Sequence, residues 1–90
     1  MPLPRRISIA CFQRDGWKCR HCNSRNGLHP HHLIYQSHGG PDDLWNLLTL
    51  CAGCHRAHHD GFLDIEWTIL DAGPRPEVQF IRRKGWKPTW

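Results

Sequence analysis

The first repeating pattern of hydrophobic and polar positions lies near the N-terminus and is typical of a helix. Ile7 and Cys11 are four positions apart, which places both on one face of a helix. Pro4 suits the first turn of this helix, and Gly16 follows the pattern as a stop signal. The pattern therefore predicts a short helix over about residues 5–15.

The remaining patterns predict strands and a second helix. Alternation of apolar with polar residues is typical of a half-buried strand, and the turn-forming residues 71–76 separate two such runs, which predicts a hairpin. The predicted elements are an extended segment over 28–35, a turn capped by Asp42 or Asp43, a strand over 47–50, a helix from Cys54 to Gly61, and hairpin strands over 63–69 and 78–81. These elements together predict a small α+β fold.

The chain length and the cysteine spacing predict that a bound metal stabilises this fold. The 90 residues indicate one domain over 1–90, and so small a core is often supplemented by a structural metal or by disulfides. Four of the five cysteines form two Cys-x-x-Cys pairs, which favour zinc over disulfides. No secretory signal or long apolar run is present, so we expect a reducing, cytoplasmic compartment and no membrane.

The charge is concentrated at the two ends of the chain. The formal net charge is +4, with five basic residues against one acidic in 1–20 and five against two in 71–90. The middle of the chain is net acidic before any metal binds, so basic flanks around a metal-binding centre suit a polyanion such as DNA. A solvated charged surface is the alternative. The residues predicted to contact phosphates are Arg5, Arg6, Arg82, Arg83 and Lys84.

The two cysteine pairs predict a structural zinc site. Cys19, Cys22, Cys51 and Cys54 offer four soft thiolates, which select zinc over magnesium or calcium and leave no open position. A competing assignment replaces one cysteine with His21 or His55. Cys11 has no partner among the motifs and is predicted to be a buried helix residue without a catalytic role.

Histidines between and just after the two cysteine pairs predict a second site. His55 and His59 are four positions apart on the predicted helix and share a face, while His31 and His32 lie on the facing extended segment. Three imidazoles with open positions are typical of a catalytic metal. His31 and His32 would point to opposite faces of a regular strand, so the strand is expected to bend or end there. The histidines interpreted as ordinary surface or core residues are His21, His29 and His38.

Several short motifs follow one another in a fixed order between residues 14 and about 60. They are Arg14-Asp15-Gly16-Trp17-Lys18-Cys19-Arg20-His21-Cys22, His31-His32-Leu33-Ile34, Gly39-Gly40, Asp43-Leu44-Trp45-Asn46-Leu47 and Leu50-Cys51-Ala52-Gly53-Cys54-His55. This ordered combination resembles the HNH endonuclease family, in particular the zinc-containing branch of bacteria and phages. The resemblance implies a ββα-metal core, here with an N-terminal helix before it and a hairpin and basic tail over 61–90 after it.

The resemblance also implies roles for individual residues. His32 matches the general base that activates the attacking water, and His31 matches a position that ligates the catalytic metal. Asn46 matches the asparagine that fixes the loop and orients the base. His55 matches the last family histidine, a metal ligand, and His59 resembles an additional helix ligand.

The choice of ligand and of metal stays open at this point. His58 stands beside His59, so either imidazole is a candidate for the additional ligand. The resemblance suggests Mg²⁺ or Mn²⁺, and three imidazoles would also accept Ni²⁺ or Co²⁺.

These inferences together predict a metal-dependent endonuclease that hydrolyses DNA phosphodiester bonds on one or both strands, of phage or bacterial origin. One alternative is a non-catalytic zinc-stabilised DNA-binding module, in which the histidines are incidental. Another is an HNH component of phage DNA packaging, whose chemistry is the same but depends on a terminase partner.

Overall fold

Helix α1, Arg5–Arg14, forms where the hydrophobic pattern predicts it. A computed structural model describes residues 3–68, 77–83 and 85 of the chain. Cys11 is the buried residue of the helix, as predicted, and the backbone N–H of Asp15 closes the last turn on the Cys11 carbonyl. Gly16 follows with a φ of 75°, a conformation that glycine adopts without strain.

Strands β1, Leu28–His32, and β2, Leu47–Cys51, pair in antiparallel fashion. His31 lies opposite Leu48, and all five residues of β2 are buried. The extended segment predicted over 28–35 is shorter as a strand, because the backbone N–H groups of Leu33 and Ile34 turn to oxygens of Asn46. The strand therefore ends at His32, as the two adjacent histidines require.

Two 3₁₀ turns and a helix complete the core that lies between the cysteine pairs. The turns are η1, Gln36–His38, and η2, Leu44–Asn46. Asp43 occupies the N-cap position of η2 but makes no side-chain cap bond. Helix α2, Ala52–His59, begins two residues earlier than predicted because the Cys51 sulfur accepts the backbone N–H of Cys54 and caps the first turn.

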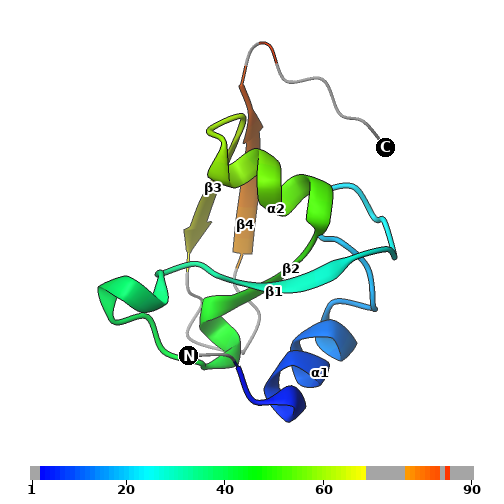
Figure 1. The fold of residues 1–90 in the computed structure, drawn as a ribbon, viewed down its shortest axis with the longest axis vertical. Helices are drawn as coiled ribbons and strands as arrows, with labels where there is room; N and C mark the ends of the chain where they lie inside the picture. Colours follow the sequence, from blue (N-terminus) through cyan, green and yellow to red (C-terminus); the bar gives the residue numbers. More distant parts are fainter. Residues whose placement is uncertain (1–2, 69–76, 84, 86–90) are drawn as a thin grey trace.

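Strands β3, Leu63–Thr68, and β4, Glu77–Arg82, form the predicted antiparallel hairpin. The predicted turn over 71–76 and residue 69 lie outside the described residues. Helix α1 lies on one side of the β1–β2 pair and α2 on the other, with β3 and β4 behind α2 in this view (Figure 1).

The hydrophobic core lies under α2 and includes the cysteines. Leu48, Leu50 and Leu63 are fully buried there. Cys19, Cys51 and Cys54 are buried beside them, and Cys22 is partly buried against the same core. Ile65, Val78 and Phe80 pack against this core from the hairpin. In the described part of the chain, no helix has the length and apolar character needed to cross a membrane. The small α+β fold with a β1–β2–α2 centre is confirmed.

Candidate metal centre and catalytic cleft

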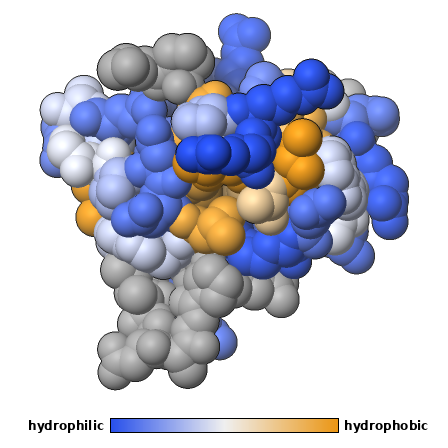
Figure 2. Space-filling view, turned by 90° about the horizontal axis from the view of Figure 1, so that it is seen from below, coloured by the Kyte–Doolittle hydropathy of each residue, from blue (hydrophilic) through white to orange (hydrophobic). Residues whose placement is uncertain are grey.

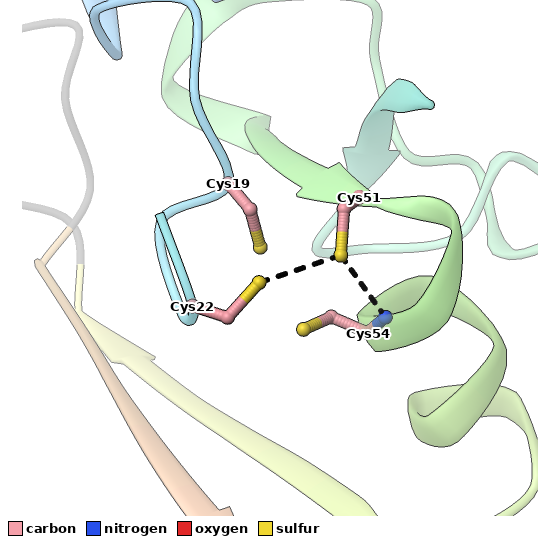
Figure 3. A group of neighbouring side chains, drawn as sticks. All are labelled: Cys19, Cys22, Cys51 and Cys54. Carbon is pink, nitrogen blue, oxygen red and sulfur yellow. Dashed lines mark hydrogen bonds between the residues drawn. The ribbon is translucent and has the colours of Figure 1, made fainter. Parts of the chain in front are cut away.

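The four paired cysteines meet at one point. Two come from the turn over residues 19–22 (the N-terminal knuckle), one from the end of β2 and one from the first turn of α2. Their sulfur atoms all lie within 4.8 Å of one another, and those of Cys22 and Cys51 are 3.5 Å apart (Figure 3). A tetrahedral zinc with Zn–S bonds of about 2.3 Å would hold its sulfurs about 3.8 Å apart. The four cysteines are therefore positioned to bind one metal ion, and their donor type suits zinc.

The electrostatics of the four thiols also favour a cation. The hydrogen bond with Cys54 lowers the pKa of Cys19 to about 4, and the same contact raises the pKa of Cys54. Burial raises the pKa of Cys22 to about 11. One thiolate in the cluster thus opposes ionisation of the others, and a divalent cation would remove that opposition.

Histidine does not replace a cysteine in this site. His21 lies beside the cluster, with Nδ1 3.3 Å from the Cys54 sulfur, and its ring packs at 4.9 Å from that of Phe80. His55 turns away toward the other histidines. The compact group consists of the four cysteines, as predicted.

The histidines of β1 and α2 line a second, open site. A cleft of about 380 Å³ is bordered by His31, His32, His55 and His59, together with Tyr35 and Gln36 among others. The structure therefore brings together the four histidines that the sequence assigns to the catalytic centre. His58 and Asn46 are not among the residues that line this cleft.

His31 and His55 are held in the neutral form that binds metal ions. Burial, together with the neighbouring imidazoles, His58 first, lowers the pKa of His31 to about 3. Burial also lowers the pKa of His55, helped by the proximity of His59. A neutral imidazole keeps a nitrogen lone pair, so both side chains are suited to act as ligands at neutral pH.

The geometry favours His59 over His58 as the additional ligand. The Nε2 atoms of His55 and His59 are 3.2 Å apart, close enough for one cation to bridge them. Both nitrogens of His58 are already occupied: Nδ1 donates to the Leu63 carbonyl at 2.7 Å, and Nε2 accepts from the Tyr35 hydroxyl at 3.0 Å. His58 thus anchors Tyr35, a residue that no sequence motif singles out.

The histidine set is looser than the cysteine set. The His31 ring lies 5.4 Å from that of His55 and 6.3 Å from that of His59, measured between centroids. The donor atoms of the four cysteines all lie within 4.8 Å of one another. Within residues 3–68, 77–83 and 85, no group of three or more histidines comes equally close together. The three imidazoles approach from two elements and leave space between them.

Asn46 fixes the two ends of the loop that joins β1 to β2. Its side chain is fully buried; Oδ1 accepts the Ile34 N–H at 2.8 Å, and Nδ2 donates to the carbonyls of Ile34 at 3.0 Å and Pro41 at 2.9 Å. The loop is closely packed here, since a Cβ at Gly40 would lie 1.8 Å from the Ile34 oxygen. Asn46 therefore sets the path of the chain immediately after His32.

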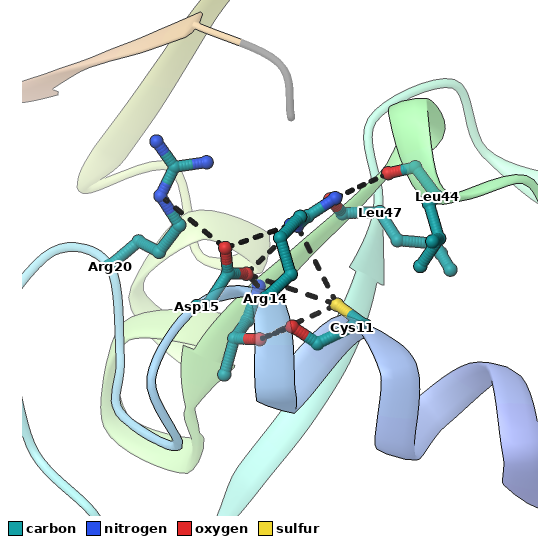
Figure 4. A network of polar contacts seen from close by, with 7 residues as sticks. Cys11, Arg14, Asp15, Arg20, Leu44 and Leu47 are labelled. Atoms are coloured by element: carbon teal, nitrogen blue, oxygen red, sulfur yellow. Dashed lines mark hydrogen bonds and ion pairs between the residues drawn. The ribbon is translucent and has the colours of Figure 1, made fainter. Parts of the chain in front are cut away.

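Arg14 holds the backbone before and after Asn46 through the carbonyls of Leu44 and Leu47 (Figure 4). Its guanidinium donates to the carbonyls of Leu44 and Leu47, both at 2.6 Å, which flank Asn46 in the sequence. Asp15 holds Arg14 at 2.8 Å and accepts the Thr49 N–H at 3.1 Å. Burial alone would raise the pKa of Asp15, but the hydrogen bond and charge of Arg14 outweigh it and lower that pKa. Arg14 and Asp15 begin the first of the sequence motifs, but the sequence alone did not indicate what the pair does.

The predicted phosphate-binding residues lie at two distant places. Arg5 and Arg6 are exposed on α1, and Arg82 and Arg83 are exposed at the end of β4, at the opposite end of the long axis (Figure 1). Arg83 forms an ion pair with Asp64, and Lys84 lies outside the described residues. From the α1 side, hydrophobic residues gather in the centre of the surface with hydrophilic residues around them (Figure 2).

One comparison with known proteins matches the segment that carries both sites. The model of a family described as HNH endonuclease matches residues 19–61. Anaredoxin from Nostoc sp. (strain PCC 7120 / SAG 25.82 / UTEX 2576) is 40% identical over 53 residues, which cover 58% of this chain and 70% of that protein. No solved structure matches the chain. The family match spans the four paired cysteines and the four histidines of the cleft.

Proposed function

This chain belongs to the HNH endonuclease family, and from that premise we propose that it is a metal-dependent endonuclease that hydrolyses phosphodiester bonds of DNA. The observation that carries the proposal is the cleft in which His31, His32, His55 and His59 meet. A DNA-binding module without catalysis would have no need to bury His31 beside two further imidazoles whose Nε2 atoms are 3.2 Å apart.

The cysteine site has a structural role in this proposal. Zinc bound by two thiolates from the N-terminal knuckle and two from the β2–α2 junction would tie the segments that enclose the cleft. Four thiolate ligands leave no open position for water or substrate, so chemistry is assigned to the histidines. Because the cysteines belong to the core, loss of this metal would also loosen the packing of Leu48 and Leu50.

The histidines supply the binding groups for catalysis. His31, His55 and His59 would hold a divalent cation, which would neutralise charge on the phosphate and on the departing 3′-oxygen. Mg²⁺ or Mn²⁺ is proposed first, and Ni²⁺ or Co²⁺ is also compatible with imidazole ligands. His32 takes the proton from the attacking water as general base. Asn46 holds the loop after His32 and so preserves the orientation of that base.

DNA is the proposed partner because its phosphates match the basic ends of the chain. Arg5, Arg6, Arg82 and Arg83 are exposed and would contribute contacts that depend little on sequence, and we add Lys84 by its position next to Arg83. The basic residues lie at opposite ends of the molecule, so a duplex contacting both would have to run along its long axis. This arrangement supports binding and adds no specificity for a base.

The test of the proposed function is a plasmid assay on zinc-loaded protein. Supercoiled plasmid is incubated with the protein and Mg²⁺, Mn²⁺, Co²⁺ or Ni²⁺ in turn, with a chelator as the control that removes the added ion. We expect nicked or linear plasmid with at least one ion and none with the chelator.

Binding measured in parallel separates the enzyme from its alternative. Protein that shifts plasmid mobility but leaves it intact with every ion would support the non-catalytic DNA-binding module instead.

A further inference from the structure

Asp42 contacts the proposed general base directly, and nothing in the sequence patterns assigns it that task. We propose that Asp42 is a positioning residue for His32: it fixes the imidazole as the Nε2–H tautomer, so that Nδ1 is the nitrogen that accepts the proton. The inference rests on the proposed function for the base itself. It goes further by naming the reacting nitrogen and the side chain that selects it.

The hydrogen-bond geometry determines the tautomer. His32 Nε2 lies 2.9 Å from Asp42 Oδ1. An ionised carboxylate only accepts hydrogen bonds, so Nε2 must carry the proton in this contact. A neutral imidazole has one N–H and one lone pair, which places the lone pair on Nδ1. In the described part of the chain, no hydrogen bond occupies that second nitrogen.

Asp42 is itself held in place. Gln36 Nε2 donates to the same Oδ1 at 3.2 Å, from the 3₁₀ turn η1. The preceding carbonyl, that of Pro41, accepts from Asn46 Nδ2 at 2.9 Å. The buried Asn46 thus fixes the backbone next to Asp42, and Gln36 fixes its side chain. A carboxylate anchored on both sides can orient an imidazole as well as choose its tautomer.

The partial shielding of the pair makes the contact effective. The side chain of His32 is 13% exposed and that of Asp42 is 39% exposed. The imidazole is therefore shielded more than its partner, and water competes mainly at the outer edge of the carboxylate. The neighbouring Asp43 offers a matched control, because it is exposed and its side chain forms no cap bond.

The first experiment reads the tautomer without any cleavage. Protein labelled with ¹⁵N in histidine and loaded with zinc at the cysteine site is compared with Asp42→Ala and Asp43→Ala by NMR near pH 8. We expect the His32 signals of the unmodified protein and of Asp43→Ala to show an Nε2–H tautomer. Asp42→Ala should show a mixture of tautomers or the Nδ1–H form. An unchanged His32 tautomer in Asp42→Ala would overturn the proposal.

The second experiment reads the consequence for the reaction. Partners that orient a reactive or ligating histidine typically contribute about 10- to 100-fold, so kcat of Asp42→Ala should fall by about that factor while KM and the Kd for Co²⁺ stay unchanged. Asp43→Ala should cleave at about the normal rate, and Asp42→Glu should recover part of the loss.

Three outcomes would contradict the positioning role. Faster cleavage by Asp42→Ala would show that the carboxylate blocks the base, and weaker Co²⁺ binding would show that it is a ligand. Unchanged kcat would show that the contact has no role in the reaction. Absence of cleavage by the unmodified protein would instead refute the proposed function, while the NMR result would still decide whether Asp42 selects the tautomer.

Discussion

Replacement of Asn46 by alanine removes the side chain that ties the two ends of the β1–β2 loop. Three hydrogen bonds are lost, one from the Ile34 N–H and two to the carbonyls of Ile34 and Pro41. A typical hydrogen bond contributes about 1 kcal/mol net, and a buried partner left unpaired costs about 1–3 kcal/mol. Because Asn46 is fully buried, we expect a loss of about 3–5 kcal/mol in the free energy of unfolding. That loss is a large part of the total free energy of unfolding of a domain, which is typically about 5–15 kcal/mol.

The assay is urea unfolding of the zinc-loaded protein at a fixed free zinc concentration, since bound metal shifts apparent stability by mass action. Asn26→Ala serves as the matched control, because Asn26 is exposed and its contact to Ser24 is made by the backbone N–H. The control should change the free energy of unfolding by no more than about 0.5 kcal/mol. A loss below about 1 kcal/mol for Asn46→Ala, with an unchanged urea dependence, would refute the assignment of Asn46 as the residue that fixes this loop.

Three further predictions concern metal, phosphate and proton. Cys22→Ser should lower bound zinc below one ion per chain and unfold or strongly destabilise the domain. Elemental analysis of the unmodified, correctly folded protein should find zinc, and a finding of no tightly held zinc, or of iron in its place, would contradict the zinc assignment. Neutralising Arg82 and Arg83 together should reduce the slope of log affinity for DNA against log salt by about 2, whereas an unchanged slope would show that neither contacts phosphate. Stability should fall as pH drops from about 6.5 toward 3, because unfolded His31 binds a proton that the folded form, with a His31 pKa of about 3, does not. His31→Gln should flatten this part of the stability–pH curve, and a curve of unchanged shape would contradict the burial argument.

The local elements were predictable because their causes lie close together in the sequence. Helix α1 follows from the spacing of Ile7 and Cys11 with Gly16 after them, and the β3–β4 hairpin follows from alternation. The start of α2 was predicted two residues late, since a cysteine sulfur acts there as the helix cap. The four-cysteine cluster was predictable from its two paired spacings.

The finer features of the cleft depend on contacts between distant residues. His58 and His59 are equivalent in the sequence, and only the path of β3 brings the Leu63 carbonyl to His58 and removes it from the candidate ligands. Asp42 and Asp43 were alternative predictions for the cap of a short turn, whereas the loop fixed by Asn46 directs the Asp42 carboxylate to His32. Such contacts follow from how the loop folds back, which residue patterns do not encode locally.

The rate of plasmid cleavage by His32→Ala tests the central claim most directly. The matched control is His38→Ala, because His38 is exposed in the same loop and does not line the cleft. Loss of a general base typically costs about 10²–10⁴-fold, so His32→Ala should cleave more slowly by about that factor, with zinc content and DNA affinity unchanged and with His38→Ala at about the normal rate. Cleavage by His32→Ala at the rate of the unmodified protein would contradict the assignment of His32 as the base and, with it, the proposed mechanism.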